Sequence, residues 1–211
     1  MLRIVPLLIA ACIAAGPLHA APDPAYQAAF VTFQKAAKDG DDKSVEAAAE
    51  QFGRLSAAQP ADPVLLAYSG AATAMRANTT LLPWRKLAFA DDGLAQLDKA
   101  LALLAPEHDA LLHQNVPATL EARFVAASTF LRLPGMFNRH ARGAGLLDEV
   151  LKNPLLATAP PGFRAAVWLR AADEAAANKR TDEARQWLQQ VAASGAPQAA
   201  IAQAKLKEIA P

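Results

Sequence analysis

A recurring pattern of small and large apolar residues is the feature that most limits the fold of this chain. In each copy a small residue is followed four positions later by a large apolar residue, three positions after that by another apolar residue, and then by a proline. The copies are Ala48–Phe52–Leu55–Pro60, Gly93–Leu97–Ala100–Pro106, Gly143–Leu147–Val150–Pro154 and Ala184–Leu188–Val191–Pro197. Offsets of four and three place these residues on one face of a helix. The small residue there allows a second helix to approach closely, and the large one fills the space beside it.

The stretches between the prolines are typical of helices. A proline ends one helix and is well suited to start the next. Glycine accounts for only 10 of the 211 residues, alanine is abundant and long β-branched runs are absent, which disfavours strands. An apolar stripe after Pro24 stops at Gly40, and Asp41 or Asp42 can cap the helix that follows. Further helices are predicted over 63–76, 84–104, 117–132, 136–151, 163–177, 181–193 and 197–209, which makes about nine in all.

Each copy of the pattern follows an earlier helix, so the repeated unit is two helices joined by a turn. The copies resemble the second helix of the tetratricopeptide repeat (TPR), which carries Ala, then Phe or Tyr, then Ala and Pro at nearly these offsets. The copies begin 41 to 50 residues apart, against about 34 in that family, and its first-helix signature is largely missing apart from Tyr68 and Gly70. The resemblance implies an all-α fold, a degenerate TPR-like helical repeat array of about four helix pairs plus a C-terminal capping helix. A generic antiparallel helical bundle is the alternative.

A second resemblance covers roughly residues 63 to 151. It is carried by Pro63, Ala67, Tyr68, Gly70, Leu97–Leu101, Pro106, Arg123, Phe124, Leu133, Pro134 and Phe137. In this order they are similar to a family of small exported TPR-like bacterial proteins, most of which are uncharacterised. The resemblance implies the same fold and export from the cytoplasm, and it implies no reaction.

The N-terminal residues also predict export. Arg3 precedes an apolar run over 4–15, and a helix breaker and small residues follow it, which is the layout of a secretory signal peptide. The run is too short to cross a bilayer of ~30 Å as a helix. We therefore expect a signal peptide over 1–20, cleaved after Ala20, and a single TPR-like domain over 21–211 in the periplasm. No other apolar run approaches membrane-spanning length, so the mature chain is expected to lack a transmembrane segment.

Cys12, the only cysteine, leaves an alternative open. The segment Ile9–Cys12 resembles a lipobox, which would make the protein a membrane-anchored lipoprotein with its lipid anchor at Cys12. Cleavage after Ala20 instead leaves a mature chain with no cysteine. It also removes Arg3, so the Lys plus Arg count falls from 21 to 20 and equals the 20 Asp plus Glu. That balance argues against nucleic acid as a partner and against a bulk electrostatic attraction to membranes.

An array of helix pairs curves into a superhelix, and its first helices line a concave face suited to a peptide or another protein. The residues expected in this groove are Tyr68, Arg76, Trp84, Arg85, Arg123 and Arg132. Arg132 opens the stretch Arg132–Arg142, whose arginines could bind an acidic segment or a lipid headgroup, or could simply pair with acids such as Asp148. The expected function is a non-catalytic scaffold or adaptor that binds another envelope protein or a peptide segment, without a cofactor.

Two other function classes stay open. His108, Asp109 and His113 have metal-ligand side chains, and the spacing of the last two would place them on one face of a helix. A metal-dependent enzyme would use these three, whereas a capped, solvent-facing helix start explains them without a metal. The second class is a carrier of a small hydrophobic ligand held between the helices. The serines lack a G-x-S-x-G context and no glycine-rich phosphate loop follows a strand, so no enzyme is expected.

Overall fold

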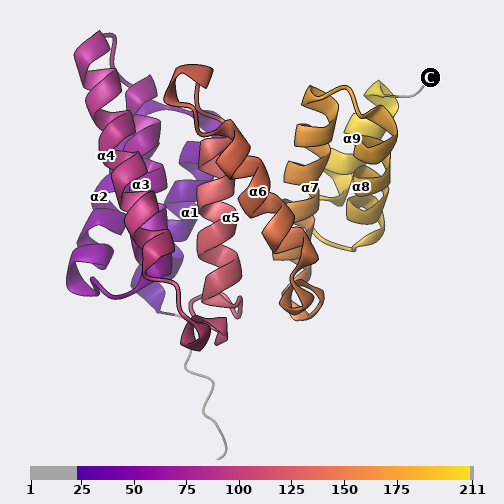
Figure 1. Ribbon diagram of the computed structural model, residues 1–211, viewed down its shortest axis with the longest axis horizontal. Helices are drawn as coiled ribbons and strands as arrows, with labels where there is room; N and C mark the ends of the chain where they lie inside the picture. Colours follow the sequence, from indigo (N-terminus) through magenta and orange to yellow (C-terminus); the bar gives the residue numbers. More distant parts are fainter. Residues whose placement is uncertain (1–22, 210–211) are drawn as a thin grey trace, which may run out of the picture.

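The computed structural model describes residues 23–209, so the expected signal peptide over 1–20 and Cys12 lie outside the described residues. Helices dominate this part of the chain (Figure 1). They are α1 (Pro24–Asp39), α2 (Asp42–Ala58), α3 (Pro63–Met75), α4 (Pro83–Ala102), α5 (Ala118–Phe130), α6 (His140–Lys152), α7 (Pro161–Ala177), α8 (Thr181–Ala193) and α9 (Ala199–Glu208). Short 3-10 helices connect them: η1 (Arg76–Asn78), η2 (Pro106–Asp109), η3 (Gly135–Phe137) and η4 (Pro154–Thr158). The all-α prediction is confirmed.

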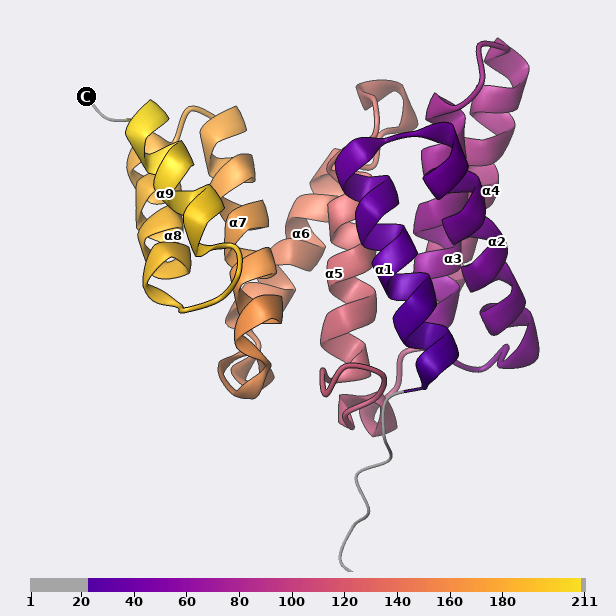
Figure 2. The ribbon, with the colours of Figure 1, turned by 180° about the vertical axis from the view of Figure 1, so that it is seen from behind.

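Consecutive helices pack as pairs. α1 packs with α2, α3 with α4, α5 with α6 and α7 with α8, while α9 packs against α8 at the end of the array. α2 also contacts α3, and α3 contacts α5, so that successive pairs are joined. Figures 1 and 2 show the pairs standing side by side, from α1–α4 at one end to α7–α9 at the other. The nine helices within 23–209 are therefore packed sequentially in adjacent pairs, consistent with a helical repeat-like array.

The recurring small residues lie where two helices cross closely. A Cβ atom added to Gly93 of α4 would lie 2.6 Å from the backbone nitrogen of Ala74 and 2.6 Å from the backbone oxygen of Gly70, both in α3. A Cβ on Gly143 of α6 would lie 2.9 Å from the Cβ of Phe130 in α5. In the middle two pairs the backbone approach thus requires glycine, as the pattern predicts.

Local sequence sets most helix ends. Gly40 ends α1 in the left-handed region with φ +67°, and the Asp41 side chain accepts the backbone N–H of Ser44 at the start of α2. Both ends agree with the prediction. The single helix predicted over 136–151 is wrong, because Asn138 adopts φ +51° after η3 and α6 begins only at His140. A left-handed residue cannot continue a right-handed helix.

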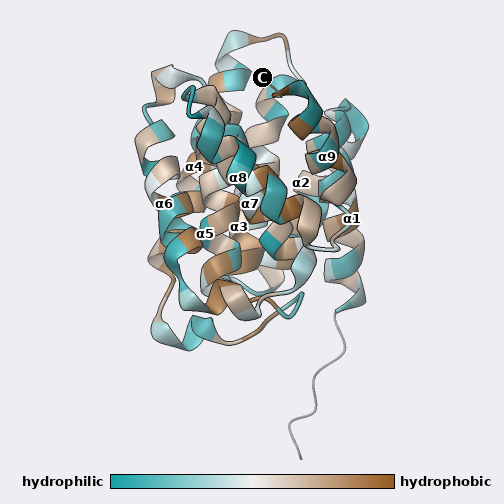
Figure 3. Ribbon diagram, turned by 90° about the vertical axis from the view of Figure 1, so that its right-hand side faces the viewer, coloured by the Kyte–Doolittle hydropathy of each residue, from teal (hydrophilic) through white to brown (hydrophobic). Residues whose placement is uncertain are grey.

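The core follows the array as a series of apolar clusters. The largest joins α1 to α5 around Tyr26, Phe52, Tyr68 and Phe130, and others follow between α5 and α7 and between α7 and α9. In the view from the C-terminal end (Figure 3), hydrophilic residues are prominent along α8. None of the helices in the described range is long and apolar enough to cross a membrane.

Candidate binding cavity on the inner helices

A cavity of about 1200 Å³ runs along alternate helices of the array. Its wall is formed by α1, α3, α5 and α7, which we call the inner helices, together with the first turns of α4 and the segments before α6 and α9. The apolar side chains of this wall include Phe30, Phe33, Met75, Leu87, Val125, Leu133, Phe137, Phe163 and Leu169. Because one helix of each pair contributes, the cavity belongs to the array as a whole and not to any one helix pair.

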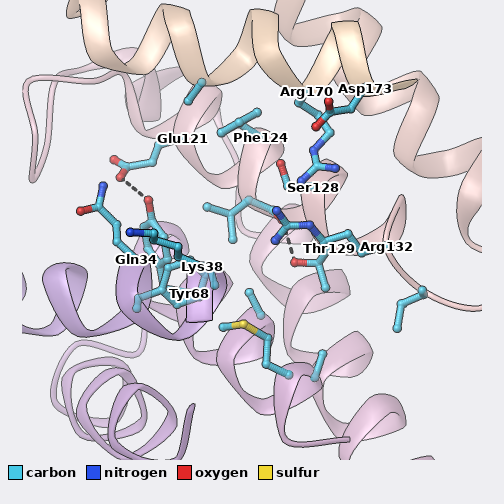
Figure 4. Close-up of a pocket in the computed structure, with 18 of the residues that line it drawn as sticks. Gln34, Lys38, Tyr68, Glu121, Phe124, Ser128, Thr129, Arg132, Arg170 and Asp173 are labelled. Atoms are coloured by element: carbon cyan, nitrogen blue, oxygen red, sulfur yellow. Dashed lines mark hydrogen bonds between the residues drawn. The ribbon is translucent and has the colours of Figure 1, made fainter. Parts of the chain in front are cut away.

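A buried carboxyl group lies at the floor of this cavity (Figure 4). Glu121 of α5 is 1% exposed. Its Oε1 accepts hydrogen bonds from the hydroxyls of Tyr26 at 2.7 Å and Tyr68 at 3.0 Å. These two tyrosines come from α1 and α3, so the three hydroxyl and carboxyl groups tie three inner helices together. Within the described chain, Glu121 Oε2 has no hydrogen-bond partner.

The surroundings of Glu121 favour its neutral form. Burial raises the pKa of this carboxyl above its ordinary value, and the two tyrosine hydrogen bonds oppose that rise without cancelling it. Burial also raises the pKa of Tyr26 and Tyr68, so both hydroxyls stay protonated and can donate. A neutral carboxyl with one unpartnered oxygen costs far less to bury than a carboxylate.

An ion pair borders the same floor. The His113 ring stacks on Tyr26 with ring centroids 4.3 Å apart, and its Nε2 lies 2.7 Å from Oδ2 of Asp62. Burial disfavours the charged imidazole, but the hydrogen bond and charge of Asp62 outweigh that effect and raise the pKa of His113. Burial favours a higher pKa for Asp62. The hydrogen bond and charge of His113 and the backbone N–H groups that Asp62 caps at the start of α3 outweigh burial and lower this pKa.

Two arginines face the cavity from neighbouring inner helices. Arg132 follows α5 and keeps an exposed end, whereas Arg170 of α7 is half-buried. Desolvation lowers the pKa of both guanidinium groups, and the nearby charge of Arg132 lowers that of Arg170 further. Arginine nevertheless stays charged at any physiological pH. Asp173 lies near the pair, but its carboxylate binds Lys205 of α9.

Neither arginine forms a direct ion pair in the described part of the chain. Within residues 23–209 no carboxylate oxygen lies within 4 Å of either guanidinium. The hydroxyl of Ser128, one turn before Arg132 on α5, is buried without a hydrogen-bond partner in the same range. Ser128 lines the same cavity as the two arginines (Figure 4). This end of the cavity therefore offers two guanidinium groups and a hydroxyl, and the nearby charges of Asp173 and Glu174 act on the arginines without forming a direct ion pair with them.

Only two of the six predicted groove residues line this cavity, namely Tyr68 and Arg132. The others point elsewhere.

Arg76 binds Glu46 of α2 with an Nε–Oε1 distance of 3.0 Å. Its guanidinium also lies 4.2 Å from the centre of the Phe89 ring. Arg123 lies on the side of α5 that faces α6, where its Nε is 3.3 Å from Oε2 of Glu149.

Trp84 and Arg85 are exposed on the first turn of α4 and do not line the cavity.

The stretch 132–142 does not form one basic surface. Arg139 and Arg142 both bind Asp98 of α4, with 2.9 Å between Arg139 Nη2 and Asp98 Oδ2. The expected alternative, that these arginines pair with nearby acids, is found for Arg139 and Arg142, but the acid is Asp98 and not Asp148, which binds Lys152 one turn later on α6. After η3 and Asn138, the first residues of α6 thus contact α4, whereas Arg132 lines the cavity.

The proposed metal ligands do not converge. His108 Nδ1 accepts the backbone N–H of Ala105 at 3.0 Å, Asp109 accepts the Thr119 hydroxyl at 2.6 Å, and His113 pairs with Asp62. The predicted helical spacing of Asp109 and His113 is wrong, because η2 ends at Asp109 and an isolated β-bridge joins residues 111 and 117. No three His, Cys, Asp or Glu side chains in the described part of the chain could hold a metal ion together.

Glu121, Ser128 and Arg170 also line the cavity but were not predicted as site residues from the sequence. A signal for the first two was present, since Glu121, Val125, Ser128 and Arg132 follow the helical spacing i, i+4, i+7 and i+11. All four line the cavity on one face of α5 and its C-terminal extension. A carboxyl, a hydroxyl and a guanidinium group at the spacing of one helix face were therefore visible in the sequence.

Comparison with known proteins adds no identity. No family model, no curated protein and no solved structure matches this chain.

Proposed function

We propose that this chain is a non-catalytic protein-protein interaction module, a TPR-like scaffold or adaptor of the bacterial periplasm. Its inner helices would hold a segment of another envelope protein. The observation that carries the proposal is the cavity itself, which is lined by the inner helix of each of four successive pairs and by the first turns of α4. Concave faces of this kind are how helical arrays bind extended partners.

The size and lining of the cavity favour a polypeptide as its occupant. Pockets for small molecules measure roughly 300–1000 Å³, and this cavity reaches about 1200 Å³. Its wall is mostly apolar but also carries polar side chains such as Gln34, Gln114 and Gln198, so it suits a segment with one apolar and one polar face. A helical segment satisfies its own backbone and presents apolar side chains along one face. We therefore propose an amphipathic helix of the partner as the bound segment.

The arginine pair supports a second proposal, that the bound segment carries a negative charge. The two guanidinium groups repel each other, and the nearby Asp173 offsets this only at a distance, so a carboxylate placed between them would relieve the repulsion and accept hydrogen bonds from both. The Ser128 hydroxyl can donate a further hydrogen bond there. We propose that the bound helix places an Asp, a Glu or its C-terminal carboxylate against Arg132 and Arg170.

The partner's affinity should depend on this pair. Replacing both residues with glutamine (Arg132→Gln with Arg170→Gln) is expected to weaken binding by roughly 30-fold or more, since loss of a desolvated charge contact costs about 2 kcal/mol or more. The Tm should not fall, because neither arginine makes an ion pair within 23–209. The partner would first be identified by crosslinking through the cavity. The purified partner would then be titrated into each variant by calorimetry.

The matched control is Arg139→Gln with Arg142→Gln, which removes two arginines that already bind Asp98 outside the cavity. This variant should bind the partner with unchanged affinity. Equal loss of affinity in both double variants, or no loss in the cavity variant, would contradict the assignment of the cavity.

A carrier of a small hydrophobic ligand is the second candidate, and the largely apolar wall supports it. Native mass spectrometry of the freshly purified protein separates the two functions. A carrier is expected to retain a ligand of a few hundred daltons, whereas an interaction module should give the mass of the chain alone.

A further inference from the structure

The first turns of α4 project beyond the helix on which α4 packs. The two helices lie close together at Gly93, against Ala74 near the end of α3. Trp84 precedes Gly93 by nine residues, which is about 14 Å along a helix at 1.5 Å per residue. In Figure 1 this part of α4 and the loop before it form the upper extremity of the α1–α4 end of the molecule.

Large apolar side chains crowd this extremity, which we call the apolar tip and define as residues 81–87. The exposed fraction is 92% for Leu81, 66% for Trp84, 43% for Leu87 and 38% for Leu82. The loop before α4 has a local hydrogen bond, since Thr80 Oγ1 accepts the backbone N–H of Leu82 at 3.2 Å. The apolar groups are thus held toward solvent and not against the core.

Two positive charges stand among these apolar groups. Arg85 and Lys86 are exposed, and neither has a carboxylate oxygen within 4 Å in the described range. The nearby Arg76, by contrast, is already bound to Glu46. The tip therefore combines leucines, an amphipathic indole and two cations without counter-ions.

We infer that the apolar tip inserts into the surface of a lipid bilayer with anionic headgroups. Tryptophan prefers the membrane–water interface, and leucines beside it can enter the acyl boundary while arginine and lysine bind the headgroup phosphates. The convex shape favours lipid over a protein partner, since the residues that dominate protein interfaces sit in packed pockets ringed by other contacts. A bilayer deforms around a projecting tip.

This inference goes beyond the proposed interaction with another protein, because it concerns a different surface and a different partner. The two surfaces are neighbours, however: Lys86 and Leu87 belong to the tip and also line the cavity. Insertion of the tip would therefore hold the mouth of the cavity next to the membrane.

Trp84 fluorescence tests the inference. The chain has three tryptophans, so the variant Trp168→Phe with Trp187→Phe leaves Trp84 as the only one. Vesicles of phosphatidylcholine with phosphatidylglycerol should shift its emission to the blue, and vesicles of phosphatidylcholine alone should do so much less. An unchanged emission with both kinds of vesicle, which is also what a tip devoted to a protein partner would give, overturns the inference.

Vesicle flotation with all tryptophans present gives a second measurement. The variants Leu81→Ser with Leu82→Ser, and Arg85→Gln with Lys86→Gln, should each weaken partition into the phosphatidylglycerol vesicles about tenfold or more. The control is Leu111→Ser with Leu112→Ser, exposed leucines that lie beyond the other end of α4. Equal partition of the tip variants and the control would overturn the inference. The cavity variant at Arg132 and Arg170 should float like the unaltered protein, so the outcome is independent of the proposed partner binding.

Discussion

Replacing Gly93 with alanine should lower the Tm by about 6–12 °C. The added Cβ would lie 2.6 Å from two backbone atoms of α3, the nitrogen of Ala74 and the oxygen of Gly70. Backbone atoms cannot turn aside as a flexible side chain can, so α3 and α4 must separate and the packing around them must loosen. Overpacking of this kind costs about 3 kcal/mol, and each kcal/mol corresponds to roughly 2–4 °C in a chain of this size.

Gly145→Ala is the matched control for this variant. Gly145 lies inside α6, and a Cβ there would meet nothing within 4 Å. Alanine should therefore raise the free energy of unfolding by about 0.5–1 kcal/mol through its better helix propensity. Thermal unfolding followed by circular dichroism measures both. If the two variants changed the Tm equally, the close crossing of α3 and α4 at Gly93 would be wrong.

Glu121→Gln should make the protein less sensitive to pH between 4.5 and 6.5. A buried carboxyl with a raised pKa stabilises the folded state fully below its ordinary value of 4.5, and this contribution is lost as the pH rises through the folded-state pKa. The loss reaches about 1.4 kcal/mol for each pH unit between the two values. Glutamine keeps an oxygen to accept the two tyrosine hydrogen bonds and cannot ionise, so the loss should disappear.

His113 and Asp62 lose their own contributions to stability outside this pH window. His113 also has a raised pKa, but its contribution is lost only as the pH rises above its ordinary value of 6.5. Asp62 has a lowered pKa, so its contribution is lost only as the pH falls below 3.8. Urea unfolding of the Gln variant and the unaltered protein at several pH values gives the difference directly.

A companion variant separates the charge of Glu121 from its hydrogen bonds. Glu121→Leu should destabilise the fold at all pH values, because it leaves the hydroxyls of Tyr26 and Tyr68 without their acceptor at a cost of roughly 1–3 kcal/mol each. If Gln were as damaging as Leu at pH 5, the carboxyl would have to be ionised in the folded state. That result would refute the neutral form of Glu121.

The fold could be predicted from sequence because its determinants are local. Residue type alone indicates a close helix crossing at Gly93. It likewise indicates the end of α1 at Gly40 and the start of α2 at Asp41. The break before α6 escaped prediction because it depends on a positive φ at Asn138, which this residue type tolerates but does not require.

The site was only partly predictable, because facing the cavity depends on how the pairs pack. Tyr68 and Arg132 were predicted and do line it. Arg123 lies on the same helix as Glu121, yet its position around the axis of α5 places its side chain against Glu149 of α6. Arg170 carries no local signal, since its importance arises only from the approach of α7 to the end of α5. Rotation and approach of this kind are properties of the packed array.

Site-specific photocrosslinking tests the role of the cavity most directly. A benzophenone side chain would replace Met136 or Leu169, which line the cavity, or Gln190, which is exposed on α8 and does not. Irradiation in the native envelope should join the same partner protein to positions 136 and 169 and none to position 190. A partner captured equally well through position 190, or through neither cavity position, would contradict the proposal that the inner helices form the binding face.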